Sequence, residues 1–469
     1  MAKYKRYTYK ELEKFCNDAF EKIGFTADES KIISDVLLLS DLYGIESHGM
    51  QRIARYHNGI KKGLIKIDAK PDIVFETPVS AVIEGHDGMG QLLSHYAMSL
   101  AIEKAKKSGI AIVNVRNSNH FGIAGYYSKM ACDEGLIGMA MTNSEAIMVP
   151  TFARKAMLGS NPIAISVPAD PYNFFFDAST TVVTRGKLEV YNKAGKTLPE
   201  GWALDANGKG STDAADVLKN IVGKVGGGIM PLGGETEQLG SHKGYGYGMF
   251  CEIFSSILSM GVTSNHTHTD GKGGTCHGFL AIDPKIFGDP AAIKEHFSTF
   301  LQELRDAPKS EGAERIYTHG EKEIIAMNDR LENGIDVNIN TVAEMIDFAK
   351  FVGMDAEALQ ATVDKYNGYV AAGVDEEFGR GADYLTTPIG EGPYYLVEQK
   401  PRFATTMGGV VINTDLQVIN TDGDVIPGLY ASGEVTGGVM GDDSPSGANN
   451  GWAVTSGKLA AESIAEALK

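Results

Sequence analysis

Residues 110–122 read IAIVNVRNSNHFG, and this stretch decides the fold class. Ile110 to Val115 is a short apolar run typical of a buried strand. It leads into a polar loop that carries His120 and ends at Gly122. Loops that follow strands commonly carry catalytic groups. The loop therefore has two interpretations: a functional site around His120, or a turn in which the histidine is only hydrogen-bonded.

Helices and strands alternate on both sides of this stretch. The segments predicted around it are, in chain order, strands Ile73–Phe75 and Ala81–Ile83, helices Gln91–Lys107 and Ala124–Asp133, and strands Leu136–Met141 and Ile163–Val167. Alternating strands and helices are typical of an α/β protein. Hairpin-like pairs among these strands favour a mixed sheet over an all-parallel one.

The segments outside this α/β region read mainly helical. A capping box of Thr26 and Glu29 opens the second of three helices predicted in the first 65 residues. Residues 285–335 also follow a helical pattern. Between them, Val222–Gly248 reads as a glycine-dense loop that leads into a helix over Met249–Met260.

His48, Arg52 and Tyr56 follow one another at intervals of four in the third predicted helix. Residues four apart share one face of a helix. Oxidation of a 2-hydroxy acid needs a base for the hydroxyl proton and a cation for the carboxylate, which arginine binds with two hydrogen bonds. The structural alternative is an arginine and a tyrosine packed at a helix interface, with His48 as a cap.

The glycine-rich phosphate loops of standard type are missing from the sequence. It contains neither the G-x-G-x-x-G fingerprint of a Rossmann fold nor a P-loop. Residues 177–187 and 241–245 combine hydroxyl groups with cations, and they predict either a pyrophosphate site or solvated loops. His266, His268 and His277 have no carboxylate at a matching spacing. We interpret them as a surface histidine tract and predict no metal.

Composition argues against several classes of function. At roughly 150 residues per domain, the 469 residues allow two to four domains. A net charge of −17 disfavours binding to nucleic acid or anionic lipid. The four cysteines lack C-x-x-C spacing, which disfavours a disulfide scaffold or a zinc module. Without a signal-peptide pattern or a membrane-spanning apolar run, the chain is predicted to be cytoplasmic.

Taken together, the segments closely resemble the type-2 malate/L-lactate dehydrogenases, a family with ureidoglycolate, sulfolactate and diketogulonate relatives. The matching runs are SHG at 47–49 with Arg52, RNSNHFG at 116–122, GSNP at 159–162, DASTT and RGK within 177–187, EGWALD at 200–205, PLGG at 231–234, HKGYG at 242–246, HGEKE at 319–323 and NGI at 333–335. They keep the family's order over roughly residues 5–340.

This resemblance implies a fold unrelated to the Rossmann fold, NAD or NADP as cofactor, and a homodimer with the active site near the subunit interface. His48 would donate or accept the proton, Arg52 and Tyr56 would face the substrate, and His120 would lie beside nicotinamide and substrate. The implied cofactor-binding residues are Phe176, Asp177, Ala178, Ser179, Thr180, Thr181, Val182, His242, Lys243, Gly320 and Glu321.

The same resemblance implies two domains in this part of the chain. Residues 1–72, completed by about 290–340, would form a helical domain on the substrate side. Residues 73–289 would form a mixed α/β domain that binds nicotinamide.

Residues from about 345 to 469 resemble the C-terminal portion of fumarate-reductase-type flavoproteins. The runs are ATVDKYNGYV at 361–370, TTMGGVVINTDLQVI at 405–419 and GLYASGEVTGGVMG at 428–441. The last normally lies against FAD, which marks Gly433 and Glu434 as a flavin-contacting remnant. However, Thr405 replaces the reductases' histidine, and residues 444–449 lack their arginine. The dinucleotide-binding half of the flavoprotein fold is missing, which disfavours FAD binding.

This C-terminal segment is predicted to be an α+β fragment. Strands are expected over 410–412, 417–419 and 429–432, with helices from Thr341 and Ala356 and over 451–468. Both families carry a helix near 340–350, so the join between them has no linker. The segment could be catalytic, inert or an interaction module.

The sequence thus predicts an oxidoreductase that transfers a hydride between NAD(P) and a small 2-hydroxy or 2-oxo acid of malate or lactate type. The alternatives are a fumarate-reductase-like FAD oxidoreductase and a bifunctional fusion of the two. Three points stay open: the identity of the acid, NAD against NADP, and which of His48 and His120 transfers the proton.

Overall fold

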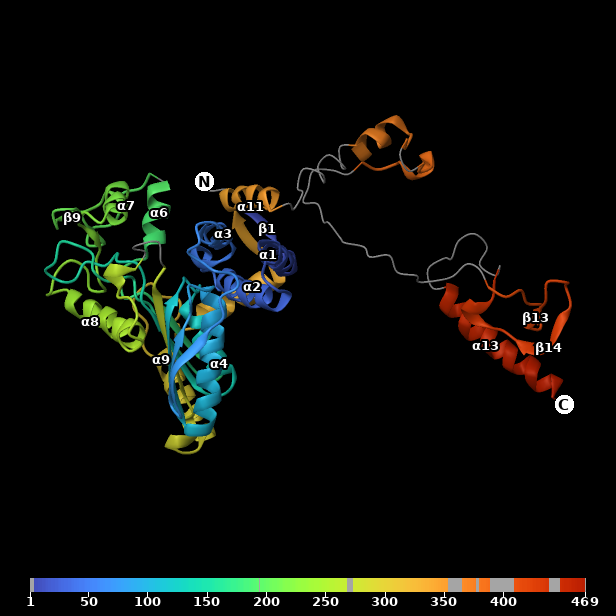
Figure 1. Cartoon of the computed structure of the whole chain (residues 1–469), viewed down its shortest axis with the longest axis horizontal. Helices are drawn as coiled ribbons and strands as arrows, with labels where there is room; N and C mark the ends of the chain where they lie inside the picture. Colours follow the sequence, from blue (N-terminus) through green and yellow to red (C-terminus); the bar gives the residue numbers. More distant parts are fainter. Residues whose placement is uncertain are drawn as a thin grey trace. The chain divides into compact units, whose positions relative to one another are not determined.

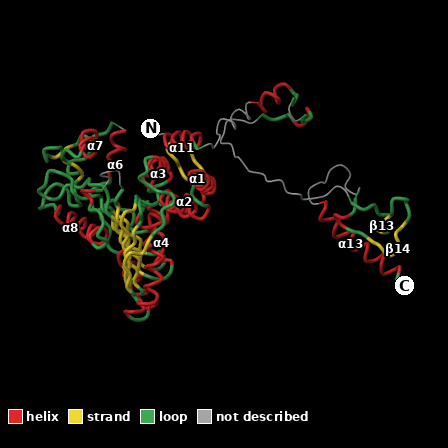
Figure 2. The backbone as a smooth tube through the Cα atoms, viewed as in Figure 1, coloured by secondary structure: helices red, strands yellow, loops and turns green. Residues whose placement is uncertain are grey.

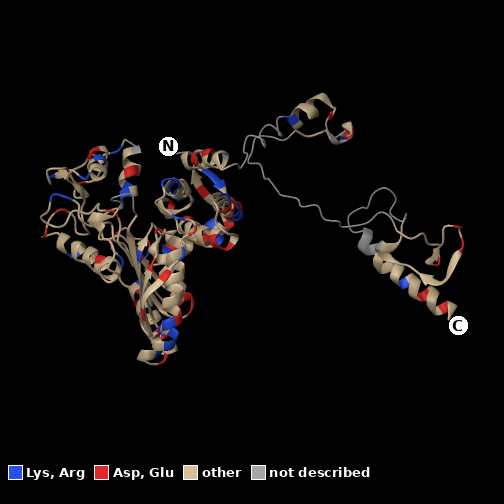
Figure 3. Ribbon diagram, viewed as in Figure 1, with Lys and Arg blue, Asp and Glu red and all other residues tan. Residues whose placement is uncertain are grey.

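The computed structural model describes residues 4–193, 195–267, 273–352, 365–376, 379–388, 409–437 and 448–468. The chain divides into two compact units, Met1–Lys365 and Tyr366–Lys469. Lys and Arg lie interspersed with Asp and Glu along the ribbon of the first unit (Figure 3).

A seven-stranded sheet forms the centre of the first unit (Figures 1 and 2). Its strands lie in the order β2 (Asp72–Thr77), β3 (Ser80–Glu84), β4 (Ile110–Ser118), β11 (Thr275–Ile282), β5 (Ile137–Thr142), β6 (Ile163–Val167) and β7 (Phe174–Ala178). β3 and β4 pair in parallel, and the other five neighbouring pairs are antiparallel. A doubly wound Rossmann sheet is mostly parallel, so the prediction of a mixed sheet is confirmed.

Helices α4 (Gly90–Ser108) and α5 (Ala124–Asp133) cover one face of this sheet. Side chains alternate between the two faces of a strand, so β4 directs Val113 and Val115 into the core beneath these helices. Asn114 points to the opposite face and donates to the carbonyl oxygen of Phe254. A single turn of π-helix, η3 (Ile253–Ile257), lies on that face.

A second core lies among helices from both ends of the first unit. These helices are α1 (Tyr9–Ile23), α2 (Ala27–Leu42), α3 (Ile53–Lys61), α10 (Glu321–Asn333) and α11 (Ile339–Phe351). Strand β1 (Tyr4–Tyr7) pairs antiparallel with β12 (Ile335–Asn338), which brings the two ends together. The capping box of Thr26 and Glu29 is confirmed at the start of α2. Helix α9 (Pro290–Asp306) lies between the sheet strands and α10 in the sequence, as the helical reading of 285–335 predicted.

A smaller subdomain follows β7. It contains α6 (Arg185–Lys193), α7 (Ala214–Gly223) and a three-stranded sheet in the order β10 (Gly228–Ile229), β8 (Ala203–Leu204) and β9 (Gly210–Ser211). Leu188, Val217 and Ile229 are buried in its own apolar core.

The predicted loop over Val222–Gly248 is wrong at its C-terminal end, because α8 (Ser241–Glu252) begins eight residues before Met249. Each glycine lowers intrinsic helix propensity by about 1 kcal/mol, so the local sequence argues against a helix here. Packing decides otherwise. A methyl group at Gly244 would lie 2.3 Å from the backbone nitrogen of Leu232, so the helix needs glycine to approach that segment.

In the part that the structure describes, the second unit contains short strands and turns together with helices, one of which is 20 residues long. These elements are a helix over residues 365–372, β13 (Gln417–Ile419), β14 (Val425–Tyr430), the turn η7 (Gly433–Val435) and α13 (Ala448–Ala467). The strand predicted over 417–419 is confirmed, and it pairs antiparallel with β14. The strand predicted over 429–432 begins earlier, at Val425. Two further features lie outside the described residues: Ala356, where a helix was predicted to start, and Thr405, which stands in place of the reductases' histidine.

Candidate active site

His48 lies in a short turn, so the prediction that it shares an α-helix with Arg52 and Tyr56 is wrong. Two 3₁₀ turns, η1 (Glu46–His48) and η2 (Met50–Arg52), precede α3. They are separated by Gly49, whose backbone is extended. The three residues therefore do not share one helix face at intervals of four. The two turns nevertheless place His48 shortly before the N-terminus of α3.

The buried carboxylate of Asp41 holds this turn in place. Its Oδ2 accepts a hydrogen bond of 2.8 Å from the backbone N–H of Met50. A methyl group at Gly49 would lie 1.8 Å from Asp41 Oδ1, so the turn requires glycine. Burial raises the pKa of Asp41 to about 7, against the opposing effects of the Met50 hydrogen bond and the Arg330 charge. Sequence analysis missed Asp41, because its position in α2 looks like any other polar helix residue.

The loop after β4 is fixed by hydrogen bonds to the backbone of distant segments. Asn119 Nδ2 donates to the carbonyl oxygens of Leu64, Asp87 and Gly88 at 2.9–3.0 Å. On the other side the loop touches the start of α4. A methyl group at Gly90 would lie 2.3 Å and 2.4 Å from the carbonyl oxygens of Asn119 and His120. The backbone at His120 is therefore clamped from two directions.

The ring of His120 is oriented by Tyr56. The phenol oxygen lies 2.8 Å from His120 Nδ1. The backbone N–H of Gly122, which can only donate, also points to this nitrogen at 3.4 Å. Burial raises the pKa of Tyr56 to about 12, so its phenol stays protonated and can donate. Both contacts favour the neutral tautomer in which Nδ1 accepts and Nε2 carries the proton.

His277 supports the same loop and is not part of a surface histidine tract. It is fully buried in β11, with Nδ1 and Nε2 each 2.8 Å from the hydroxyl oxygens of Thr142 and Ser118. Phe121 stacks on its ring at 4.4 Å between centroids. The spacing in the sequence gave no sign of this burial. His266 is exposed, and His268 lies outside the described residues.

The two candidate catalytic histidines face each other. The rings of His48 and His120 are stacked, with centroids 5.5 Å apart and planes 24° apart. His48 Nδ1 lies 2.9 Å from Ser47 Oγ. The structure therefore brings together His48, Tyr56 and His120, which lie up to 72 positions apart in the sequence.

Arginines surround this pair of imidazoles. Arg52 donates from Nε to the carbonyl oxygen of Ser47 at 2.5 Å. Arg55 is exposed on the first turn of α3. Arg185 begins α6 and is ion-paired with Glu145. A methyl group at the next residue of α6, Gly186, would lie 3.7 Å from Arg52 Nη2, so α6 closes the site on this side.

Burial and positive charge keep both histidines neutral. Burial, followed by the charges of Arg52 and Arg55, lowers the pKa of His48 to about 3. Burial and the charge of Arg55 lower the pKa of His120 well below its usual value. An anion bound beside the arginines would oppose these charge effects and favour the protonated rings.

The residues predicted to bind a cofactor fall in two groups. Phe176 and Asp177 lie at the end of β7 beside residues 319–321, where the His319 ring packs against that of Phe176. Asp177 Oδ2 accepts from the N–H of Gly125 at the start of α5, at 2.7 Å. Burial raises the pKa of Asp177 to about 6. The carboxylate of Glu321 is buried between Arg305, Arg315 and Thr318.

The second group lies where residues 180–182 meet the segment before α8. The N–H of Leu232 donates to the carbonyl oxygen of Thr180, and the N–H of Val182 donates to that of Met230. The Thr180 and Thr181 hydroxyls donate to backbone carbonyls. His242 and Lys243 are exposed in the first turn of α8, whose N-terminus has no side-chain cap.

The buried carboxylate of Glu252 joins several loops near this group, and it has no ion-pair partner among the residues that the structure describes. Glu252 accepts hydrogen bonds from Asn161, Ser256 and Ser264 at 2.5–2.8 Å. It immediately precedes the π-helical turn, an irregularity that is frequent at functional sites. Sequence analysis missed this residue, and its position in a helix gives no signal for it.

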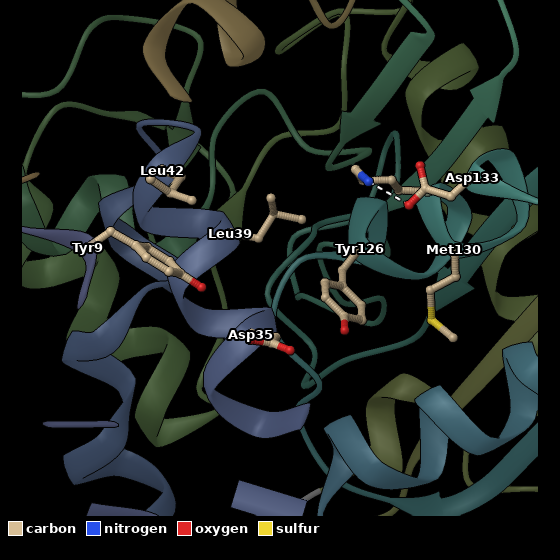
Figure 4. Close-up of a pocket in the computed structure, with 8 residues that line it drawn as sticks. Tyr9, Asp35, Leu39, Leu42, Tyr126, Met130 and Asp133 are labelled. Atoms are coloured by element: carbon tan, nitrogen blue, oxygen red, sulfur yellow. Dashed lines mark hydrogen bonds and ion pairs between the residues drawn. The ribbon is translucent and has the colours of Figure 1, made fainter. Parts of the chain in front are cut away.

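A cavity of about 280 Å³ lies apart from the two histidines (Figure 4). It is lined by Tyr9, Asp35, Leu39, Leu42, Tyr126, Lys129, Met130 and Asp133. Its charged lining residues are already paired, as in the ion pair between Lys129 and Asp133 drawn there. Within the described ranges no group of acidic, histidine or cysteine side chains could hold a metal ion. None of the described helices is long and apolar enough to cross a membrane.

Several proteins are similar to this chain over about three quarters of its length. The chain is 42% identical over 353 residues to a malate dehydrogenase of Pyrococcus abyssi, covering 75% of this chain and 96% of that protein. It is 36% identical over 354 residues to the L-sulfolactate dehydrogenase of Methanocaldococcus jannaschii, covering 74% and 96%. The crystal structure of malate dehydrogenase from Entamoeba histolytica matches with a TM-score of 0.73 and 37% identity, covering 76% of this chain and all of that one.

The family model for malate/L-lactate dehydrogenase matches residues 7–346. That range contains the seven-stranded sheet, both histidines and the residues that orient them. The resemblance of the C-terminal residues to flavoproteins remains a prediction. Over residues 7–346, the chain belongs to the malate/L-lactate dehydrogenase family.

Proposed function

We propose that the chain is an NAD(P)-dependent 2-hydroxyacid dehydrogenase of the malate and sulfolactate type. The observation that carries the proposal is the stacked pair of neutral imidazoles, His48 and His120, beside the guanidinium of Arg52. This set supplies a proton acceptor and a carboxylate-binding cation within one site. The names of the relatives, malate and L-sulfolactate dehydrogenase, support the same substrate class.

The hydrogen bonds support different roles for the two histidines. His120 accepts at Nδ1, so its neutral ring offers an Nε2–H that can hold the substrate oxygen or the nicotinamide. Among the described residues, His48 Nδ1 faces the Ser47 hydroxyl, whose oxygen can accept a hydrogen bond from an Nδ1–H. The Nε2 of His48 is then free to take the hydroxyl proton during oxidation and to return it during reduction.

The first turn of α8 fits the phosphates of a dinucleotide. Its N-terminus has no side-chain cap, although the N–H groups of Ser241 and Lys243 donate to the carbonyl oxygens of Thr236 and Gly240. The positive end of the helix dipole and the basic side chains of Lys243 and His242 favour an anion there. Residues 176–182 and Gly320 are proposed to complete the binding surface. When bound, the nicotinamide accepts or supplies the hydride. We also propose that the chain forms a homodimer, which its mass in solution would test.

An NADH-oxidation screen against a panel of 2-oxo acids tests this function. His48→Asn should lower kcat by about 10²- to 10⁴-fold, the usual contribution of general acid–base catalysis, and leave NADH affinity nearly unchanged. If His48→Asn keeps full kcat while His120→Asn abolishes it, the two roles are reversed. If the wild-type protein reduces none of the acids, the proposed function is wrong.

A further inference from the structure

The carboxylate of Glu252, at the end of α8, accepts hydrogen bonds on both of its oxygens. Oε1 lies 2.8 Å from the backbone nitrogen of Ser264 and 2.8 Å from the Ser256 hydroxyl. Oε2 lies 2.8 Å from Asn161 Nδ2 and 2.5 Å from the Ser264 hydroxyl. Each oxygen therefore faces one nitrogen that can only donate. An ionised carboxylate satisfies both nitrogens, whereas an amide in either orientation would set its own NH2 against one of them.

Two further contacts fix the orientation of the Asn161 amide. Its Nδ2 also donates to the carbonyl oxygen of Gly248 at 3.1 Å, and its Oδ1 accepts from the backbone N–H of Ser144 at 3.2 Å. The backbone of Asn161 has a φ of +35°, a left-handed conformation that a residue with a side chain keeps only where the surrounding structure holds it. Glu252 thus helps to hold a strained turn through an amide of defined orientation.

This turn supports Thr180, which belongs to the strip of residues 176–182 proposed to bind the cofactor. The Thr180 hydroxyl can donate to the carbonyl oxygen of Asn161 at 3.1 Å, and the Thr180 N–H donates to that of Ser160 at 2.9 Å. The carbonyl oxygen of Thr180 in turn accepts from the N–H of Leu232, in the segment before α8. Thr180 is buried. It therefore supports the strip from beneath.

We propose that Glu252 is a positioning residue for cofactor binding, and that it acts through Asn161 on Thr180 and the strip 176–182. The inference rests on the proposed function, which takes this strip and the first turn of α8 as the cofactor surface. One helix then carries both the basic side chains for the phosphates and the carboxylate that holds the strip. Loss of the carboxylate should weaken cofactor binding. It should affect proton transfer much less, because other residues hold the two active-site histidines.

Glu252→Gln keeps the shape of the side chain and tests the proposal directly. The new NH2 must face either Asn161 Nδ2 or the Ser264 N–H, so the hydrogen bonds cannot all re-form. Fluorescence titration of the full chain with NADH and with NADPH identifies the cofactor that the wild-type protein binds more tightly. Its dissociation constant should rise by about tenfold or more. At saturating cofactor, kcat with a 2-oxo acid that the wild-type protein reduces should stay within about threefold.

Thr180→Val tests whether the effect passes through the strip. It removes the hydroxyl contact to Asn161 and leaves the Glu252 carboxylate with all of its partners. It should raise the cofactor dissociation constant by about 3- to 10-fold. Combined with Glu252→Gln it should add less than its separate effect, because both changes act along one route.

Ser255→Ala is the matched control for the loss of a buried hydroxyl. Ser255 lies in the π-helical turn after Glu252 and donates to the carbonyl oxygen of Cys251 at 2.7 Å. Its hydroxyl makes no hydrogen bond to the Glu252 carboxylate. The cofactor dissociation constant of Ser255→Ala should therefore stay within about twofold of the wild-type value.

Three results would overturn the inference. An unchanged cofactor dissociation constant in Glu252→Gln would leave the carboxylate a structural group only. A fall in kcat without weaker cofactor binding would mean that Glu252 acts through Asn143, which lies 3.4 Å from Oε1 and accepts from the N–H of Cys276 in β11. Additive effects of Glu252→Gln and Thr180→Val would assign the two residues to separate routes.

Thermal denaturation shows whether each variant is folded. If Glu252→Gln does not fold, Thr180→Val decides alone, and an unchanged cofactor dissociation constant in that variant overturns the inference. The proposed function is judged separately, on the wild-type protein. It survives all of these results if the wild-type protein reduces a 2-oxo acid, and it fails together with the inference if none is reduced.

Discussion

His48 and His120 are held neutral by their surroundings, and this defines their chemistry at the scale of single residues. Burial disfavours a charged ring, and the neighbouring arginines add to the effect. A neutral imidazole is ready to accept a proton in alcohol oxidation. Reduction needs the opposite form, which the free protein scarcely populates at neutral pH. The negative charge of the bound substrate must therefore favour protonation of His48, which donates the proton in the proposed mechanism.

The two directions of the reaction should consequently depend differently on pH. With a pKa of about 3 in the free protein, His48 is neutral throughout about pH 6–9. We expect kcat/KM for hydroxy-acid oxidation to be flat in this range with respect to His48. For 2-oxo acid reduction it should fall about tenfold per pH unit, because the protonated fraction falls by that factor. Initial rates at saturating cofactor would measure both profiles. If kcat/KM for reduction instead had its half-maximal value near about pH 6.5, the usual pKa of histidine, the lowered pKa of His48 would be contradicted.

At the scale of elements, the site depends on contacts between loops and helix ends. The turn before α3 rests on Asp41 of α2, and the loop after β4 rests on the start of α4. Both contacts require glycine, at Gly49 and Gly90, because a side chain would occupy the space of a neighbouring atom. Close backbone packing therefore sets the relative positions of the two histidines.

Gly90→Ala should displace the His120 loop. The added methyl group would overlap the carbonyl oxygens of Asn119 and His120, so one element has to move. Displacements of about 1 Å in an active site can cost about 10²-fold, and we expect kcat to fall by about 10- to 100-fold. Overpacking should also lower the free energy of unfolding by about 1–3 kcal/mol.

Gly457→Ala is the matched control for this substitution. Gly457 lies within α13 with no atom in reach of an added methyl group, so kcat should not change. Steady-state kinetics and thermal denaturation of both variants make the comparison. Unchanged kcat in Gly90→Ala would show that the loop tolerates the shift.

At the scale of the whole molecule, the helix at the end of the dehydrogenase unit belongs to its core. Met345 and Phe348 of α11 are buried among α1–α3. The rings of Phe348 and Phe351 both pack edge-to-face with His57 of α3, at centroid distances of 5.2 and 5.1 Å. The core of the unit therefore extends to Phe351, beyond residue 345, where the resemblance to flavoproteins begins.

Deleting residues 353–469 should leave dehydrogenase turnover within about tenfold of the full chain, a change of about 1.4 kcal/mol in the barrier. Deleting residues 339–469 should instead destabilise the unit, because the loss of a buried Met or Phe side chain costs about 2–5 kcal/mol. Turnover and thermal denaturation of both deletions test this. If deleting residues 353–469 lowered turnover by more than about tenfold, the second unit would contribute to the active site or to a dimer.

Whether the purified protein contains flavin tests the role of the second unit. Gly433 is held by α13 through a hydrogen bond of 2.9 Å to Ser456 Oγ, and the side chain of Glu434 lies outside the described residues. Purified full-length protein should be colourless if the missing dinucleotide-binding half prevents FAD binding. A yellow protein that loses its colour in the 353–469 deletion would instead support the bifunctional alternative.

Local patterns in the sequence determined the strand that begins at Ile110, the capping box of Thr26 and the absence of a Rossmann fingerprint. The predicted end of that strand at Val115 is wrong, because β4 continues to Ser118 before the loop begins. They also identified His48, Arg52, Tyr56 and His120 as candidates. These features depend on residues within a few positions of one another, where periodicity and propensity carry the information. The α8 helix was missed because its glycines reflect a distant contact rather than a local preference.

Only the tertiary structure decided how the candidates are arranged. It replaced the expected helix at His48 by a turn, placed Tyr56 on His120 across 64 residues, and buried His277 beneath the same loop. It also enclosed the Glu321 carboxylate between two arginines. The physical reason is that burial and long-range contacts determine pKa values, ring orientation and unbalanced charge. None of these is encoded by spacing along the chain.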